Sequence, residues 1–486
     1  MNKIVRYMDK VSKKSIINVI FTISVSIIII LYLVNFKQNL ISIAITSIVV
    51  YALFFISWGI QCKNKVNFYL IFLLATYVFY FGQFILLLFG AEYTNPSRTI
   101  IGELIPYDNI IFTGKFILIY MIILHVGVLI STCDINKFCN RNILDQKEKS
   151  YIANKGFKKV AILLFVISII PSLIILYNNI KITFTYGYGA IFQSESYTTG
   201  GFNNILRFLS TFTIPSLLML IIIYKNSNKI KIINIIVITY LILYFLSGSR
   251  LQGVLLISTL LLIRHYWYKP FKISGIIKVS VIGLILLILL NMISALRNII
   301  YSSGDIGYII KTTMDNIVNN NPLFLALEEG GYTFLAIATV ITYCPLVVPY
   351  NYGMTYFNSL FMLVPNLFWS VHPAANTNTD IVFRGFLTKY GGIGSSFISE
   401  SYYSFGYFSI ILALIFGILL GLLNKAIMKN AINRNFTKFY IYIYISQFTL
   451  FYVRSDTVSF WRNLVYYGVI PIFIANLFYK KKKEYR

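Results

Sequence analysis

The chain has 486 residues, of which 58% are hydrophobic and only 12% are charged. A soluble domain carries about 25% charged residues, a disordered chain is poorer in apolar residues, and a small secreted scaffold needs more than the four cysteines present. The composition therefore excludes these classes and predicts an integral membrane protein that crosses the bilayer many times. The net charge of +26 then needs an explanation of its own.

Apolar runs long enough to cross the roughly 30 Å hydrocarbon core of a bilayer recur along the chain. Because these runs are continuous rather than alternating, they predict helices and not a β-barrel. Twelve spans are predicted, at residues 16–35, 40–60, 67–90, 112–131, 160–177, 208–224, 232–247, 251–263, 279–295, 405–424, 439–453 and 463–479. We therefore expect an all-α, polytopic membrane protein.

The longest segment between predicted spans covers residues 296–404. Apolar stretches at 332–348 and 357–370 lie within it, and each either crosses the membrane, dips into it or packs on its surface. If both cross, the count rises to fourteen and the sidedness of the other segments is unchanged. We treat the chain as one polytopic domain with nine N-terminal spans (1–295), this large external loop (296–404) and three C-terminal spans (405–486).

The basic residues fall mainly on one side of the predicted membrane. With the N-terminus placed inside, the inner segments hold 30 of the 42 Lys and Arg residues but only 5 of the 16 acidic residues. The positive-inside rule predicts this asymmetry for an even number of spans with both termini cytoplasmic. The net charge is thus explained by orientation, and no nucleic-acid partner is expected.

Arginine, by contrast, dominates the outer ends of the predicted spans. The outer arginines of interest are Arg250, Arg297, Arg384, Arg454 and Arg462. A charge beside hydrocarbon costs several kcal/mol, and a guanidinium binds phosphate oxygens in a bidentate way. We interpret the set as an anion-binding group, with anchoring in the lipid headgroup region as the alternative. Asp456, in FYVRSDTVSFWRN, is expected to pair with a nearby arginine.

A second group of candidates surrounds residues 390–421, YGGIGSSFISESYYSFGYFSIILALIFGILLG. Glu400 in this stretch either removes a proton from a hydroxyl or pairs with an arginine. His372, in SVHPAAN, is the one histidine predicted in an outer segment, and it is either structural or a proton-transfer group. The chain contains no P-loop, GxSxG or HExxH motif, and neither a metal nor a cofactor is expected.

The stretch just quoted resembles the late-chain motif of the Wzy-type oligosaccharide repeat-unit polymerases of O-antigen and capsular polysaccharide. The GSR turn at 248–250, the large outer loop, and the arginine-bearing end at 454–462 that leads into NLVYYGVIPIF are similar too. The resemblance implies a metal-independent glycosyltransferase in the bacterial cytoplasmic (inner) membrane, with its active site facing the periplasm or exterior. Its implied substrate is an oligosaccharide on undecaprenyl pyrophosphate, and its implied partners are a flippase and a chain-length regulator.

The same resemblance implies roles for the candidate residues. The five outer arginines would bind the pyrophosphate, whose charge grows as it leaves. Glu400 or His372 would accept the proton of the attacking sugar hydroxyl. Tyr402 and Tyr403 would contact sugar rings, although tyrosine is also enriched at membrane interfaces in general.

Three other functions remain as alternatives. A ligase that transfers finished glycan to another acceptor has a similar topology with outer arginines and a loop histidine. A polysaccharide flippase would be a non-enzyme, but its loops are short and its cations face a central cavity. A secondary transporter would show ionisable groups at the membrane midplane, which the spans before residue 250 scarcely contain.

Overall fold

The computed structural model describes residues 2–62, 64, 66–90, 105–135, 153–186, 201–248, 250–271, 275, 322–361, 373, 377–386 and 394–473. Every regular element within these residues is helical. Eight helical segments among them are long and apolar enough to cross a membrane. The prediction of an all-α, polytopic membrane protein is confirmed.

The predicted spans coincide with helices wherever the structure describes them. The eight candidate spans are Lys13–Asn35, Leu40–Gln61, Phe68–Leu88, Tyr107–Ser131, Gly156–Tyr186, Ile205–Ile223, Lys229–Leu246 and Phe397–Ile432. The predicted span at 279–295 and residues 474–479 of the last predicted span lie outside the described residues. The predicted spans at 251–263 and 439–453 are helical but are not among these candidates. Two compact units divide the chain: unit 1 comprises Met1–Asp145, Leu327–Asn433 and Phe448–Asn463, and unit 2 comprises Gln146–Ala326, Arg434–Gln447 and Leu464–Arg486.

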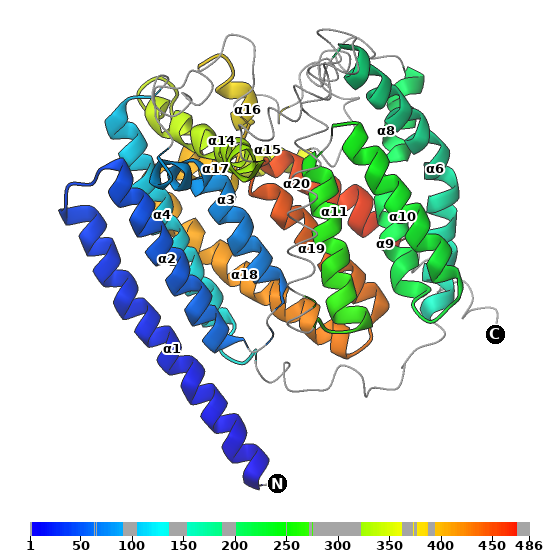
Figure 1. Ribbon diagram of the computed structural model, residues 1–486, viewed down its shortest axis with the longest axis horizontal. Helices are drawn as coiled ribbons and strands as arrows, with labels where there is room; N and C mark the ends of the chain where they lie inside the picture. Colours follow the sequence, from blue (N-terminus) through cyan, green and yellow to red (C-terminus); the bar gives the residue numbers. More distant parts are fainter. Residues whose placement is uncertain are drawn as a thin grey trace. The chain divides into compact units, whose positions relative to one another are not determined.

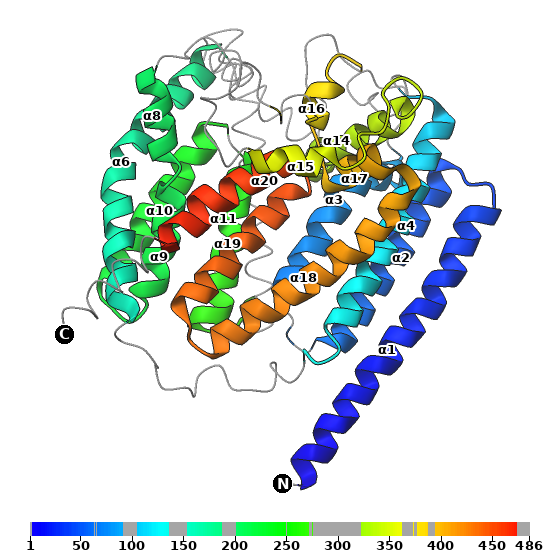
Figure 2. The same cartoon turned by 180° about the vertical axis from the view of Figure 1, so that it is seen from behind.

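The long helices of unit 1 lie side by side in Figures 1 and 2. They are α1 (Asn2–Asn35), α2 (Leu40–Gln61), α3 (Phe68–Leu88), α4 (Tyr107–Ser131) and α18 (Ser409–Ile432). The backbones of α4 and α18 come close because glycines face each other. A Cβ added to Gly417 would lie 2.0 Å from the Leu124 carbonyl oxygen, and one added to Gly127 would lie 2.5 Å from that of Leu414. Small residues permit such close helix packing in membranes.

A buried histidine joins three of these helices. His125 of α4 is hydrogen-bonded through Nε2 to the Ser57 hydroxyl of α2 and through Nδ1 to the Tyr69 hydroxyl of α3, both at 2.7 Å. Its ring also stacks on Phe54, with 4.4 Å between the ring centroids. Both ring nitrogens therefore have partners within the helix bundle, as a polar group away from water requires.

Four short helices and α14 gather at one end of the long helices of unit 1 (Figure 2). They are α15 (Met354–Leu360), α16 (Thr379–Val382), α17 (Phe397–Phe405), α20 (Thr457–Asn463) and most of α14 (Pro322–Tyr343). α14 contains most of the apolar stretch predicted at 332–348, whereas residues 362–370 of the stretch predicted at 357–370 lie outside the described residues. Gly406, with φ of 55°, and the 3₁₀ turn η4 (Gly406–Phe408) separate α17 from α18.

Unit 2 contains another set of adjacent helices, shown in both views. They are α6 (Ala153–Tyr186), α8 (Gly201–Ser210), α9 (Thr213–Ile223), α10 (Lys229–Leu246) and α11 (Arg250–Ile263), followed by the π-helical turn η1 (Arg264–Tyr268). α6 continues beyond the predicted end at 177 because Asn178, Asn179 and Lys181 lower the hydropathy without breaking a helix. α19 (Phe436–Tyr452) begins in unit 2 and ends in unit 1, and η5 (Leu464–Val469) belongs to unit 2.

The glycine contact between α4 and α18 is testable. We expect Gly417→Ala to lower the free energy of unfolding by about 1–3 kcal/mol, because the new methyl group would meet backbone atoms that cannot move independently. Gly59→Ala is the matched control, since nothing lies within 4 Å of a Cβ at that position. Denaturant unfolding of the two variants in detergent micelles measures the difference, and equal stabilities would contradict the close approach.

Candidate functional site

Glu400 lies in the first turn of α17 and is completely buried. A reciprocal capping box starts this helix: the Ser396 hydroxyl accepts the Ser399 N–H at 3.1 Å, and the Ser399 hydroxyl accepts the Ser396 N–H at 2.9 Å. Because the first turn of a helix is thereby fixed at both serines, the direction of the Glu400 side chain is fixed as well.

The carboxylate of Glu400 accepts hydrogen bonds from two residues of the C-terminal segment. The Thr457 N–H donates to Oε1 and Oε2 at 3.1 and 3.0 Å, and the Thr457 hydroxyl donates to Oε2 at 2.5 Å. The Tyr452 hydroxyl donates to Oε2 at 2.9 Å. The alternative in which Glu400 pairs with an arginine is therefore not realised among the described residues. The carboxylate instead satisfies a backbone N–H at the start of α20, which has no partner within that helix.

Asp456 provides the second carboxylate at the start of α20. Its Oδ1 accepts the Ser459 N–H at 2.7 Å, and its Oδ2 accepts a hydrogen bond from the amide of Asn378. The expected pairing of Asp456 with an arginine is not found among the described residues, because the helix N-terminus and Asn378 supply the donors. We call Asn378, Glu400, Tyr452, Asp456 and Thr457 the carboxylate cluster.

Asn378 extends the carboxylate cluster to the segment that carries Arg384. Its Oδ1 accepts the Asp380 N–H at 2.9 Å and thereby caps α16. Asp380 in turn accepts the Gly394 N–H at 2.7 Å and pairs with Arg384, with 3.4 Å between Oδ2 and Nη2. The Arg384 side chain is 59% exposed, so this surface ion pair leaves its guanidinium accessible to other anions.

Hydroxyl groups beside Glu400 connect α17 to α4 and α15. The Ser401 hydroxyl is 3.1 Å from the hydroxyls of both Tyr120 and Tyr356. Burial, together with the nearby Glu400 carboxylate, raises the pKa of Tyr356 well above its usual value. The Tyr356 hydroxyl therefore stays protonated and can donate to Ser401.

Two more of the predicted arginines lie in the C-terminal segment that also carries Tyr452, Asp456 and Thr457. Arg454 is half-buried, and its guanidinium lies over the ring of Phe79, 5.7 Å from the centroid. Arg462 of α20 is exposed. The structure thus brings the segments that carry Arg384, Arg454 and Arg462 together in unit 1 with Glu400.

The remaining predicted residues are placed differently. Arg250 is the first residue of α11, in unit 2. Arg297 and His372 lie outside the described residues. Tyr402 and Tyr403 are 3% and 5% exposed, and they pack edge-on against Phe116 and Phe383, respectively.

Sequence reasoning did not single out Tyr452, Thr457 or Asn378. The NTNTD sequence at 376–380 does contain a helix-capping signal, since Asn and Asp favour N-cap positions. Nothing in the sequence indicates that Asn378 also contacts Asp456. Within the described part of the chain, no three His, Cys, Asp or Glu side chains lie close enough together to hold a metal ion.

The long apolar helices and the carboxylate cluster at the ends of helices define a polytopic membrane protein with a polar site. A family model described as O-antigen polysaccharide polymerase Wzy matches residues 16–483. The chain belongs to this family, and it polymerises oligosaccharide repeat units of O-antigen. The resemblance noted in the sequence is confirmed, and the ligase and flippase alternatives are not favoured. No curated protein and no solved structure matches the chain.

The hydrogen bond between Asn378 and Asp456 makes a prediction about stability. We expect Asn378→Ala to lower the free energy of unfolding by about 1–3 kcal/mol, because it removes a helix cap and a donor to a carboxylate. Asn228→Ala is the control, since Asn228 occupies an N-cap position without a side-chain capping bond. Denaturant unfolding in micelles compares them, and a control variant that is destabilised as much would refute the special role of Asn378.

Proposed function

We propose that the protein transfers the growing glycan from undecaprenyl pyrophosphate to the next lipid-linked repeat unit, at the outer face of the bacterial cytoplasmic membrane and without a metal ion. The bond between the anomeric carbon and the pyrophosphate oxygen breaks, and the pyrophosphate leaves with the bonding electrons. A hydroxyl oxygen of the incoming sugar forms the new glycosidic bond and gives its proton to a base. A flippase that supplies repeat units and a chain-length regulator are the proposed partners.

The observation that carries this proposal is the hydrogen-bonded link between the arginine-bearing segments of unit 1. Asn378 joins the Arg384 segment to Asp456, and Glu400 binds the backbone that follows Arg454. Positioned guanidinium groups stabilise the charge that develops on a leaving phosphate more effectively than mobile ones do. The excess of inner basic residues supports the proposed orientation, in which these arginines face outward.

The proposed anion-binding group consists of Arg454, Arg384 and Arg462, together with Arg250 and Arg297. Arg384 and Arg462 are accessible to a charged headgroup, since the first is 59% exposed and the second is also exposed. A lipid-linked substrate would keep its chain in the bilayer and present its pyrophosphate at the level of these helix ends. Tyr402 and Tyr403 are retained as proposed sugar contacts, although reaching them requires the surrounding aromatic side chains to separate.

Glu400 and His372 are the two candidates for the base. Both carboxylate oxygens of Glu400 already accept hydrogen bonds, and the side chain is completely buried. We therefore assign Glu400 a positioning role, in which it orients the turn between Arg454 and Thr457. His372 is then the proposed base, with Glu400 as the alternative.

Replacement of the arginines tests the proposed pyrophosphate site. We expect Arg454→Ala and Arg250→Ala to slow elongation by about 10²–10³-fold, the usual effect of removing one group that stabilises the transition-state charge. Cells that depend on either variant should still display single repeat units, resolved from long glycan by gel electrophoresis. Arg264→Ala, at an exposed position of η1 predicted to be cytoplasmic, should leave the long glycan unchanged. Normal long glycan in both outer-arginine variants would contradict the proposed role of Arg454 and Arg250 in binding pyrophosphate.

Two substitutions of Glu400 distinguish positioning from base catalysis. Glu400→Gln keeps an oxygen that can accept the Thr457 N–H, so a positioning residue should lose only about 10-fold in elongation rate, whereas Glu400→Ala should lose about 100-fold. The pH–rate profile should keep its shape in Glu400→Gln. If Gln is as inactive as Ala, and the limb of the profile that reports the base disappears, Glu400 is the base instead.

A further inference from the structure

Unit 2 contains a pocket that the arginine and carboxylate groups do not explain. It lies between α6, α9, α10 and the junction after α8, and it has a cavity volume of about 80 Å³ with an open mouth. This volume is smaller than that of a pocket that encloses a whole drug-sized ligand, roughly 300–1,000 Å³, so the open pocket has room for one small group and not for a whole oligosaccharide. All of its lining residues belong to unit 2.

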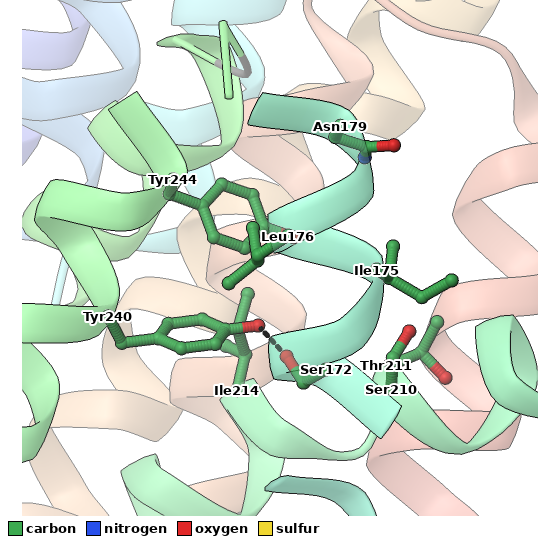
Figure 3. Close-up of a pocket in the computed structure, with 9 residues that line it drawn as sticks. All are labelled: Ser172, Ile175, Leu176, Asn179, Ser210, Thr211, Ile214, Tyr240 and Tyr244. Carbon is green, nitrogen blue, oxygen red and sulfur yellow. Dashed lines mark hydrogen bonds between the residues drawn. The ribbon is translucent and has the colours of Figure 1, made fainter. Parts of the chain in front are cut away.

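The lining of this pocket is rich in hydrogen-bonding groups (Figure 3). The polar lining residues are Ser172, Asn179, Ser210, Thr211, Tyr240 and Tyr244. Ile175, Leu176 and Ile214 supply the apolar part. None of these nine described residues carries a charge, so the lining does not suit a phosphate, a carboxylate or an ammonium group. Hydroxyl and amide groups beside aromatic rings suit a molecule with neutral hydroxyls and apolar C–H faces, which is the surface of a sugar.

Some of these polar groups already have partners, whereas one does not. The hydroxyls of Ser172 and Tyr240 lie 2.8 Å apart, and Ser210 donates to the Arg207 carbonyl at 2.7 Å. The half-buried amide of Asn179 makes no hydrogen bond within the described structure. A ligand in the pocket would supply the missing partner.

Two contacts connect the pocket to the turn that carries Arg250. Tyr244, which lines the pocket, donates from its hydroxyl to Gln252 at 2.8 Å, two residues after Arg250. The Thr183 hydroxyl of α6 donates to the Ser247 carbonyl at 3.1 Å, which holds the end of α6 against the end of α10. The pocket therefore lies near the first residues of α11, at the ends of α6 and α10 that are predicted to face outward.

We propose that this pocket binds a neutral sugar residue of the lipid-linked glycan, next to the pyrophosphate at Arg250. The assignment rests on the proposed role of Arg250, and it adds a subsite that selects the sugar part of the same substrate. The apolar side of the pocket contacts the ring face, and the Asn179 amide hydrogen-bonds to a ring hydroxyl.

A labelling experiment measures whether a ligand occupies the pocket. Thr211 is exposed at the pocket, so Thr211→Cys can be labelled with a maleimide after the four native cysteines are replaced by alanine. The probe is the lipid-free repeat-unit oligosaccharide, released from the host glycan by mild acid, added to the full chain in phosphatidylcholine nanodiscs. At ten times its dissociation constant, the oligosaccharide should slow labelling about 10-fold. Thr185→Cys, also exposed but outside the pocket, is the control for general effects.

Two matched variants test the contribution of Asn179. Asn179→Leu should weaken protection of Thr211→Cys about five-fold, the effect of one lost hydrogen bond. Asn178→Leu changes the adjacent, exposed asparagine of the same helix, which does not line the pocket, and should not weaken it. Equal protection in both variants would overturn the proposed sugar contact.

The remaining outcomes separate this subsite from the wider mechanism. Inorganic pyrophosphate should not protect Thr211→Cys, and protection by it would contradict a neutral ligand. Protection only by a glycosyl-diacylglycerol added to the nanodiscs would reassign the pocket to a membrane glycolipid and overturn the proposal. No protection by the oligosaccharide would refute the subsite even if Arg250→Ala stops elongation. Normal elongation in Arg250→Ala would instead refute the proposed pyrophosphate site, whatever the labelling result.

Discussion

The carboxylate of Glu400 is the contact on which the candidate site of unit 1 depends. It is completely buried, and it binds the backbone and hydroxyl of Thr457 and the hydroxyl of Tyr452. Burial of a carboxylate is costly unless donors replace its water, so this arrangement fixes α17, the end of α19 and the start of α20 in one geometry. Arg454 lies within the turn that these bonds hold. The position of the cation therefore depends on a buried carboxyl group with which it forms no ion pair among the described residues.

The helices of the membrane region were largely predictable because a span is determined by local composition. The predicted segments 40–60 and 67–90 correspond to α2 (Leu40–Gln61) and α3 (Phe68–Leu88). The positions at which one helix ends and the next begins were harder to predict. Hydropathy does not register the positive φ of Gly406 that separates α17 from α18. It also does not show that polar residues after 177 continue α6, since an asparagine can remain helical when its neighbours pack.

The candidate site was predictable only in part. Glu400, Asp456 and the arginines attracted attention because charge beside hydrocarbon is costly and therefore informative. Their partners are hydroxyl and amide side chains, which are frequent and carry no such signal. Glu400 and Thr457 are 57 residues apart in sequence, and Asn378 and Asp456 are 78 apart. Contacts over such distances depend on the tertiary fold, and a single sequence contains no measure of them.

The proposed reaction requires two kinds of binding surface, one for the pyrophosphate and one for the sugar. A pyrophosphate leaving group requires fixed positive charge, whereas a neutral sugar requires hydroxyl partners and an apolar surface without excess charge. In unit 1 the arginines are ordered by a network that uses carboxylates, and in unit 2 the pocket beside Arg250 has no charged lining residue. Keeping arginines out of the proposed sugar pocket favours sugar binding there. A guanidinium inside the pocket would need an anion as its partner, and a neutral sugar has none.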